Sequence, residues 1–309
     1  MSHPVTESKE IQDFLDQVAG LDQDGGDPRM KTIVRRLVGD FYAAIEDLGI
    51  TQSEFWKALH FMQEGAPEFV LIGPGLGFDR FFDELLDAVD KKAGQDGGTK
   101  RAIEGPLYVE GAPLSDGFAE MCTDEDGTPM ELSGVVKDEN GKPIAGAIVD
   151  LWHAGDTGGY SHFDPSLGEY VFRRRIRTGS DGAYKVKSIV PSSYGAPPDG
   201  STTRLCSALG RVAHRPAHVH YFISAPGYKH LTTQFNLSDD PWLYKDFAWA
   251  TRDELIVEPK EIDGVQHLNF DITLVKGKDK DDEESIDRPR MSLEGYGVKK
   301  EDATIKIYD

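Results

Sequence analysis

The sequence predicts a mainly β protein with α-helices, in which an antiparallel β-sandwich is preceded by an N-terminal helical region. Over about the first hundred residues, apolar side chains recur at the spacing of amphipathic helices. Beyond that point, short runs rich in β-branched residues alternate with glycine and proline, which is typical of an antiparallel sandwich or barrel. We therefore divide the chain into a helical region at 1–102, a β-sandwich domain at 103–275, and a charged linker with a C-terminal tail at 276–309.

The start signals of the helices support this division. Asp27 followed by Pro28 is typical of a helix N-cap and first helical position. Thr51, with Glu54 three residues later, forms a capping box for the next helix. Apolar stripes run along these helices and along 78–89, so the helices must pack on each other, on the β domain or on a second copy of the chain.

Six segments have the pattern of strands, with short apolar or β-branched runs bounded by turn residues. The clearest is a strand-turn-strand unit whose turn begins at Asp138 and contains Asn-Gly. After Val275 a run of almost entirely charged residues predicts a solvated linker. The expected strands are 133–136, 147–152, 184–190, 217–224, 231–236 and 268–275.

The composition and charge exclude several classes of protein. The 309 residues are 39% hydrophobic and include 33 Gly and 17 Pro, which excludes a wholly disordered or collagen-like chain. With 34 Lys+Arg against 54 Asp+Glu, the formal net charge is −20, so nucleic-acid binding is not expected. The apolar runs are too short for a membrane span. No export signal is visible, and Cys122 and Cys206 are interpreted as reduced thiols, so we expect a cytoplasmic protein.

Two histidines form the densest candidate for a metal site. Successive side chains of a strand point to opposite faces, so His218 and His220 project to the same face. A pair of imidazoles is a common half of a metal site. The alternative is a pair of surface histidines on an edge strand, which Val219 and Phe222 disfavour because apolar neighbours indicate a central strand. We interpret His214, in the preceding turn, as structural.

Two tyrosines in expected loops could add oxygen donors to such a site. Tyr160 and Tyr194 each lie in a stretch rich in glycine, serine and proline. A phenolate is a hard anionic donor that suits ferric iron, and a phenol with a pKa of ~10 is ionised at neutral pH only beside a strongly Lewis-acidic ion. Taken singly, either tyrosine is more often a packing residue with a hydrogen-bonded hydroxyl.

Six motifs surround these candidates. They are Ile103-Glu-Gly-Pro-Leu-Tyr-Val, Leu151-Trp-His-Ala, Tyr160-Ser-His-Phe-Asp-Pro, Pro191-Ser-Ser-Tyr-Gly, Arg215-Pro-Ala-His-Val-His and Leu231-Thr-Thr-Gln. In combination they resemble the intradiol ring-cleaving dioxygenase family, and within it the catechol 1,2-dioxygenase branch most closely. The resemblance covers nearly the whole chain up to about Val275, and the residues beyond depart from it apart from Asp287-Arg-Pro-Arg.

The resemblance implies a non-haem iron(III) ion, one per subunit, held by Tyr160, Tyr194, His218 and His220. It implies an oxidoreductase of aromatic hydrocarbon catabolism, in the beta-ketoadipate pathway. Catechol bound to the iron would react with O2, and the ring would open between the two hydroxyl-bearing carbons to give cis,cis-muconate. Tyr194 would take one of the catechol protons.

The resemblance also assigns residues around the substrate. Arg215 would stabilise negative charge that develops in the ring, and the alternative is an arginine paired with a buried acid. Gln234 would be a polar group near the same ring, or a structural residue only. The substrate pocket would otherwise be apolar. Its expected residues are Leu71, Pro74, Ile103, Pro106, Leu107, Arg215, Phe247 and Ala248.

By the same resemblance, the helical region would pair two subunits into a homodimer whose interface encloses bound lipid. Hydroxyquinol and substituted catechols are alternative substrates. A hydroxyquinol-cleaving relative would place a polar group against the third hydroxyl, and a chlorocatechol-cleaving relative usually has a shorter helical start; neither departure is present. A non-catalytic β-sandwich binding module is the alternative from another class, since 135–152 also resembles accessory sandwich domains, but such a module needs no loop tyrosines beside a His-x-His.

Overall fold

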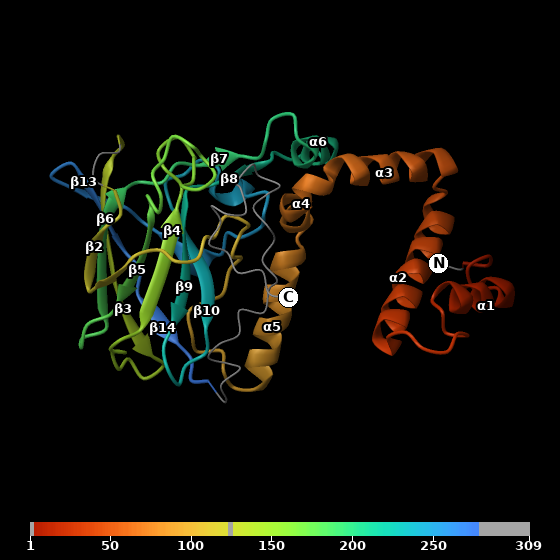
Figure 1. Cartoon of the computed structure of the whole chain (residues 1–309), viewed down its shortest axis with the longest axis horizontal. Helices are drawn as coiled ribbons and strands as arrows, with labels where there is room; N and C mark the ends of the chain where they lie inside the picture. The colour runs from red at the N-terminus through yellow and green to blue at the C-terminus, as the bar shows by residue number, and fades with distance from the viewer. Residues whose placement is uncertain (1–2, 123–125, 278–309) are drawn as a thin grey trace. The chain divides into compact units, whose positions relative to one another are not determined.

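The computed structural model describes residues 3–122 and 126–277. The chain divides into two compact units, Met1–Ala66 and Pro67–Asp309. In the described residues, the first unit is helical and the second holds all the strands (Figure 1). The predicted boundary at residue 102 falls between α5, which ends at Lys92, and the first strand, which begins at Leu114. Nearly all of the predicted tail, from 278 onward, lies outside the described residues.

Three helices form the first unit: α1 (Lys9–Val18), α2 (Pro28–Leu48) and α3 (Gln52–Gly65). Asp27 caps α2 by accepting the backbone N–H of Arg29 at 2.8 Å. Thr51 and Glu54 form both hydrogen bonds of the capping box at the start of α3. The helix starts predicted from the sequence are therefore confirmed.

Helices also open the second unit, and they contact α6 (Ser201–Ala208) and the connecting segments of this unit. Glu68 accepts the backbone N–H groups of Ser201 and Thr202, at 3.1 and 2.9 Å, and so caps a helix far along the chain. The guanidinium groups of Arg101 and Arg252 pair with Asp87 on α5, at 2.9 and 3.1 Å. The helical elements here are η1 (Ala66–Glu68, at the junction of the units), α4 (Phe69–Gly75), α5 (Phe78–Lys92), α6 (Ser201–Ala208), η2 (Leu243–Lys245) and η3 (Asp253–Leu255).

The strands within the described residues form two sheets and one small ribbon. The first sheet has the order β1 (Leu114–Asp116), β5 (Arg173–Arg177), β4 (Ile148–His153), β9 (His218–Ser224), β10 (Leu231–Leu237), β11 (Ile256–Val257). The second has the order β12 (Lys260–Ile262), β13 (Val265–Asn269), β3 (Pro129–Asp138), β6 (Ala183–Ile189), β2 (Phe118–Glu120), and β14 (Ile272–Leu274) also pairs with β3. The ribbon pairs β7 (Tyr194–Gly195) with β8 (His214–Arg215).

The predicted sandwich is confirmed, but its strand pairing is mixed. The pairs β4–β5, β4–β9, β9–β10 and β3–β6 are antiparallel, as expected, whereas the outer pairs β1–β5, β10–β11 and β2–β6 are parallel. The strand expected at 268–275 is instead two strands, β13 and β14. Between them the chain passes over Gly134, where a Cβ atom would lie only 2.0 Å from the carbonyl oxygen of Phe270.

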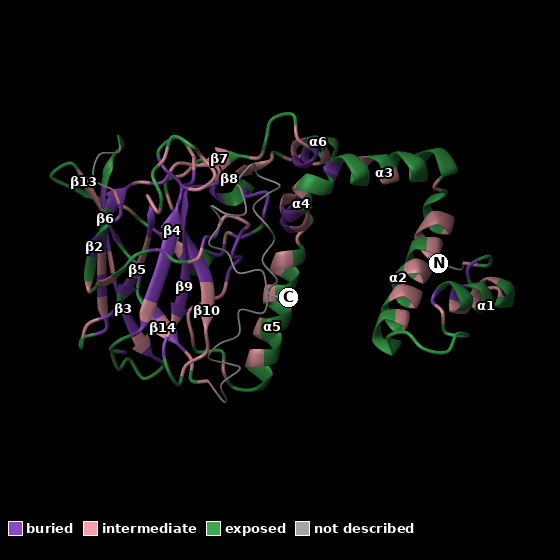
Figure 2. Cartoon of the chain, viewed as in Figure 1, coloured by how far each residue is buried: buried purple, intermediate pink, exposed green. Residues whose placement is uncertain are grey.

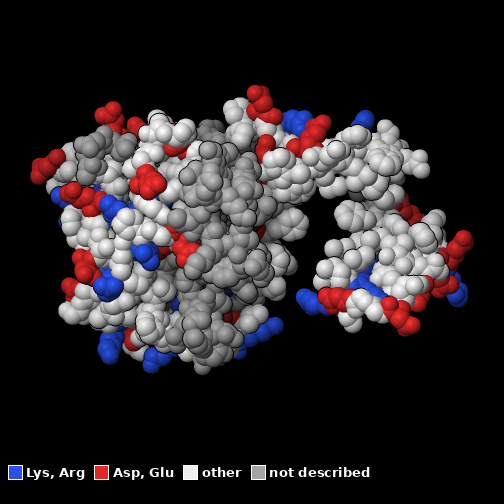
Figure 3. Space-filling model, in the orientation of Figure 1, with Lys and Arg blue, Asp and Glu red and all other residues white. Residues whose placement is uncertain are grey.

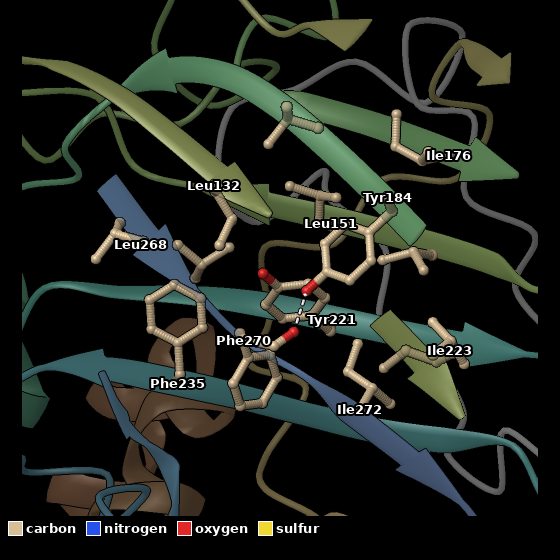
Figure 4. Close-up of a cluster of buried hydrophobic side chains, with 14 of the residues drawn as sticks. Leu132, Leu151, Ile176, Tyr184, Tyr221, Ile223, Phe235, Leu268, Phe270 and Ile272 are labelled. Atoms are coloured by element: carbon tan, nitrogen blue, oxygen red, sulfur yellow. Dashed lines mark hydrogen bonds between the residues drawn. The ribbon is translucent and has the colours of Figure 1, made fainter. Parts of the chain in front are cut away.

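The core lies between the two sheets, where the strands carry most of the buried residues (Figure 2). Figure 4 shows Leu132 of β3, Leu151 of β4 and Phe235 of β10 within one apolar cluster. Tyr184 of β6 lies in the same cluster, and its hydroxyl donates to the carbonyl oxygen of Phe270 at 2.7 Å. The buried hydroxyl of Tyr184 is thus satisfied between the two sheets.

We expect Tyr184→Phe to lower the free energy of unfolding by about 1–2 kcal/mol, because the buried carbonyl of Phe270 loses its hydroxyl donor while the ring packing is kept. Urea unfolding followed by circular dichroism measures this change. An unchanged unfolding midpoint would show that the hydrogen bond contributes nothing to stability.

The surface has two features that bear on partners. Neither α2 nor α5 has a buried residue, and each exposes large apolar side chains, among them Phe41 at 64% and Phe81 at 63%. On the face drawn in Figure 3, basic side chains are interspersed with acidic ones instead of forming one basic patch.

No helix within 3–122 or 126–277 is sufficiently long and apolar to cross a membrane. Neither Cys122 nor Cys206 forms a disulfide, as predicted; Cys122 is half-buried and Cys206 is buried.

Candidate metal centre

Four side chains from three parts of the second unit converge on one point. Tyr160 comes from the connection between β4 and β5, Tyr194 from β7, and His218 and His220 from β9. The Nε2 atom of His218 lies 3.0 Å from Nε2 of His220, 3.4 Å from the Tyr160 hydroxyl and 3.5 Å from the Tyr194 hydroxyl, and the two hydroxyls are 3.4 Å apart. Donor atoms bound at about 2.1 Å to one metal ion lie about 3.0–3.4 Å from each other. The four donors therefore suit a single ion.

Strand register explains why these side chains meet. In the antiparallel pairs, His220 lies opposite Trp152 of β4 and opposite Gln234 of β10. The indole of Trp152 stacks on the His220 imidazole, with centroids 4.9 Å apart and an interplanar angle of 11°. In the ribbon, Tyr194 lies opposite Arg215. Cross-strand packing therefore fixes the plane of one imidazole and brings Tyr194 to the start of β9.

A glycine lets a further segment pass close to the centre. Gly105 has φ of +72°, and a Cβ atom there would lie 3.3 Å from Cε1 of His220. Glycine avoids both the unfavourable backbone conformation and the crowding. The segment around Gly105 contains Ile103, Pro106 and Leu107, which the resemblance to the family places in the substrate pocket.

The two imidazoles are in the form that binds metal. Nδ1 of His218 donates to the carbonyl oxygen of Pro216 at 2.6 Å, so Nε2 carries the free electron pair. Burial, followed by the charge of Arg215, lowers the pKa of His218 well below its usual range. Burial likewise lowers the pKa of His220, with smaller effects of His218 and Arg215. Both rings are therefore neutral at pH 7.

Tyr160 needs a nearby cation to ionise. Burial raises the pKa of Tyr160 well above its ordinary value, and Tyr194 raises it further, against the opposing charges of Arg215 and Arg173. Within the described residues, no group of three or more His, Cys, Asp or Glu could hold a metal ion. A metal site here therefore depends on its phenol oxygens, and a set of two phenolates with two imidazoles fits a hard ferric ion.

Arg215 lies beside the four donors and is buried. Its Nη1 lies 3.0 Å from Nε2 of His218, and its Nη2 donates to Oε1 of Gln234 at 2.7 Å. Asp246 accepts from Nε and Nη2, both at 3.3 Å. Burial lowers the pKa of Arg215, but the charge and hydrogen bonds of Asp246 together with the oxygens of Tyr194 and Tyr160 raise it, and the net shift of the pKa is upward, so the guanidinium stays charged. The structure thus places a fixed positive charge next to the centre.

The expected pocket residues near the centre lie in two buried clusters. Ile103 packs with Ala248. Leu107 packs against the cluster that contains Tyr160, and Pro106 precedes it in the same half-buried segment. A cavity of about 730 Å³ between α5 and the segment 95–104 is lined by Ile103 but by none of the four donors, so we do not assign the substrate to it.

The remaining pocket residues lie on or near α4. Leu71 and Pro74 belong to this helix. A Cβ atom on Gly75, the next residue, would lie 3.4 Å from the ring of Phe247. The carbonyl oxygen of Gly75 also accepts from Arg211, whose guanidinium donates to the carbonyl oxygen of Phe247. These contacts connect α4 to the loop of Phe247, and the role of both in a substrate pocket stays a prediction.

Two further histidines lie nearby and contact other parts of the second unit. His214 packs against Trp242, with ring centroids 4.4 Å apart, which agrees with its interpretation from the sequence. His153 is buried, with Nδ1 donating to the carbonyl oxygen of Ala154 at 2.7 Å and Nε2 lying 2.9 Å from the Ser188 hydroxyl. Burial lowers the pKa of His153 to about 4.

The depressed pKa of His153 predicts a loss of stability in acid. The unfolded pKa is about 6.5, so between about pH 6.5 and 4 the unfolded chain binds a proton that the native protein does not. The free energy of unfolding should therefore fall by about 2 kcal/mol between about pH 7.5 and pH 5 from this residue alone. Urea unfolding at both values measures it, and His153→Gln should reduce the pH dependence. If the free energy of unfolding of His153→Gln changed with pH as much as that of the wild type, His153 would not be the source of the pH dependence.

Sequence reasoning missed three residues that support the centre. Trp152 lies within the motif Leu151-Trp-His-Ala, and the register of the expected strands could have placed it opposite His220. Arg173 is buried with its Cζ 5.9 Å from the centroid of the Tyr160 ring, but it stands in a run of arginines that is typical of a surface strand. Asp246 lies in a loop with no pattern that signals its role.

Comparison with known proteins identifies the family. Residues 103–276 match the family model described as Dioxygenase, and residues 27–94 match the one described as Catechol dioxygenase N terminus. The chain belongs to the intradiol dioxygenase family.

Its relatives and structural neighbours narrow this class to one branch. The catechol 1,2-dioxygenase of Pseudomonas sp. is 48% identical over 267 residues, covering 85% of this chain and 88% of that protein. The catechol 1,2-dioxygenase of Acinetobacter baylyi is 43% identical over 311 residues, with 95% and 100% covered. The crystal structure of catechol 1,2-dioxygenase from Pseudomonas arvilla has a TM-score of 0.88 and 47% identity, covering 94% of this chain and 99% of that one. The resemblance to the catechol 1,2-dioxygenase branch is thus confirmed.

Proposed function

We propose that this protein is a catechol 1,2-dioxygenase, which adds both atoms of O2 to catechol and opens the ring between the two hydroxyl-bearing carbons to give cis,cis-muconate. The observation that carries the proposal is the convergence of two phenol oxygens and two imidazole nitrogens on one point, beside a buried guanidinium, in a member of this family. The relatives that carry the name catechol 1,2-dioxygenase match most of this chain and support catechol as the substrate.

Tyr160, Tyr194, His218 and His220 would hold one non-haem iron(III) ion per subunit. When bound there, ferric iron would take both catechol oxygens and make the ring carbons reactive toward O2. The protein would supply neutral imidazoles, through burial and the Pro216 hydrogen bond, and two phenols that ionise beside the ion.

The two tyrosines differ in exposure, which supports different roles. Tyr160 is 3% exposed, and the buried cation of Arg173 lies near its ring. Tyr194 is half-buried on a two-residue strand. Tyr194 therefore has more freedom to move, and we assign to its hydroxyl oxygen the acceptance of one catechol proton.

Arg215 would act on the substrate ring, and Gln234 would lie beside it. The guanidinium is held by Asp246 and Gln234 with Nη1 toward the donor atoms. A fixed positive charge in a water-poor site stabilises negative charge that develops on a ring carbon. Gln234 positions the guanidinium through its Oε1 atom. The apolar side chains of the expected pocket would orient the ring and exclude water; they are Leu71, Pro74, Ile103, Pro106, Leu107, Phe247 and Ala248.

Product analysis with labelled oxygen tests this function. The purified protein is given catechol under ¹⁸O2, and the product is examined by mass spectrometry. We expect a dicarboxylic acid in which each carboxyl group contains one ¹⁸O atom. Parallel assays with hydroxyquinol and 4-chlorocatechol distinguish the alternative substrates. If either compound is turned over faster than catechol, that compound is the preferred substrate. No ring-opened product from any of the three would contradict the proposal and favour the binding-module alternative.

We also infer a cytoplasmic homodimer that pairs through the N-terminal helices and holds lipid at the interface. The exposed apolar stripes of α2 and α5 support the pairing.

We expect Phe41→Glu to convert the dimer to monomers in light scattering, because a charge would have to be buried in an apolar interface. The matched control is Thr32→Glu, an exposed position on the opposite side of α2, which should stay dimeric. A monomeric wild-type protein would contradict the inferred homodimer. A dimer that yields no lipid on solvent extraction would contradict the inferred lipid at its interface.

A further inference from the structure

Asp246 is a buried carboxylate to which the proposed reaction assigns no direct role. Asp246 follows η2 in a loop of the second unit, and its side chain is 1% exposed. Its two oxygens accept four hydrogen bonds, two from Arg215 and two from the backbone of its own loop. This side chain therefore connects a residue assigned to the reaction with the wall of the expected substrate pocket.

The guanidinium contacts fix the direction of Arg215. Oδ1 of Asp246 accepts from Nε and Oδ2 accepts from Nη2, a two-pronged geometry that sets the guanidinium plane. The same Nη2 donates to Oε1 of Gln234, so Nη1 is the nitrogen that faces His218. Rotation of the guanidinium would break both contacts with the carboxylate.

The backbone contacts fix the loop that follows. Oδ1 accepts the N–H of Ala248 at 3.0 Å, and Oδ2 accepts the N–H of Ala250 at 3.2 Å. Between them Trp249 has φ of 58°, a left-handed conformation that costs a non-glycine residue free energy and needs such support. The N–H of Phe247 donates to the carbonyl oxygen of His214 at 3.0 Å, which holds the loop against the residue before Arg215.

We propose that Asp246 is a positioning residue, which aims the Arg215 guanidinium at the substrate and at the same time holds Phe247 and Ala248 as the pocket wall. The inference rests on the proposed function. Each carboxylate oxygen accepts one guanidinium N–H and one backbone N–H, so a shift of either group disturbs the other. Reaction rate through Arg215 and substrate selectivity at Ala248 are therefore coupled through one side chain.

A double-mutant cycle tests the coupling in the full-length protein with Asp246→Asn, Arg215→Met and both together. Asparagine replaces one oxygen by an NH2 group, so two of the four donors lose their acceptor at nearly constant volume. With Arg215 present, we expect kcat for catechol to fall about 10- to 100-fold and the preference for catechol over 4-methylcatechol to change. In the Arg215→Met background, the same substitution should lower kcat by less than about 3-fold, because its route through Arg215 is gone.

Thermal unfolding gives a readout that is independent of activity. Arg215→Met leaves the Asp246 carboxylate buried without its cation and should lower Tm, and adding Asp246→Asn should recover part of the loss. The matched control is Asp138→Asn at the end of β3, another buried carboxylate, which accepts the backbone N–H groups of Asn140 and Lys142. This control should leave kcat unchanged.

The proposal would be overturned if Asp246→Asn lowered kcat by the same factor with Arg215 present and in the Arg215→Met background, and if the Tm shifts of the two single variants added up to that of the double variant. If Asp138→Asn lowered kcat as much as Asp246→Asn does, the proposal would be overturned as well, since any buried aspartate would then have the same effect. If the wild-type protein does not cleave catechol, the proposed function fails. The coupling in Tm then decides alone whether Asp246 holds Arg215.

Discussion

Tyr160→Phe should remove iron binding and turnover together. The substitution deletes one anionic oxygen donor from the converging set while the ring that packs near Arg173 is kept. Loss of a residue that only orients a metal ligand typically costs 10- to 100-fold in affinity, so loss of a ligand should cost more than about 100-fold. Iron content by elemental analysis and kcat/KM for catechol measure the two effects.

Tyr184→Phe is the matched control for this variant. It makes the same chemical change at another buried tyrosine, in the layer between the two sheets (Figure 4). We expect it to lower stability modestly but to keep full iron content and turnover. A Tyr160→Phe protein that retains stoichiometric iron and wild-type kcat would exclude Tyr160 as a ligand.

Arg215→Met should lower kcat by about 10²–10³-fold, because a preorganised positive charge beside the reacting ring is lost. Methionine keeps much of the side-chain length. KM should change less than kcat, since the charge is needed most when negative charge develops on the ring. Steady-state kinetics with catechol separate the two constants.

Arg215→Lys provides the comparison for this second variant. Lysine keeps the charge but cannot form the two-pronged contact with Asp246, so its kcat should lie between those of the wild type and Arg215→Met. Iron content should be near that of the wild type in both variants. If Arg215→Met turned over catechol at the wild-type rate, the arginine would be structural, as the alternative interpretation holds.

The residues of the candidate centre could be named from the sequence because each signal is local. His218 and His220 alternate within one strand, which places both on one face before any fold is known. Tyr160 and Tyr194 have no such periodicity; their place in expected loops made them candidates, and the resemblance to a family assigned them as ligands. Their convergence on the histidines depends on the β4–β5 connection and on the β7–β8 ribbon, which are tertiary features.

The parts that the sequence did not predict depend on long-range contacts. β7, β8 and β11 have two residues each, too few to show alternation. β5 is a run of arginines with one isoleucine, so its buried Arg173 could not be told from its surface neighbours. Asp246 gains its importance from Arg215, which is distant in sequence and close only after β8 and the loop beyond η2 have come together.

The most direct test of the iron centre is the visible spectrum of the purified protein, before and after catechol is added without oxygen. We expect a band from charge transfer between the phenolates of Tyr160 and Tyr194 and ferric iron, which should colour the protein red. Catechol should shift this band to longer wavelength as it joins the metal. A protein that stays colourless after reconstitution with iron would contradict a centre built from two tyrosines and two histidines.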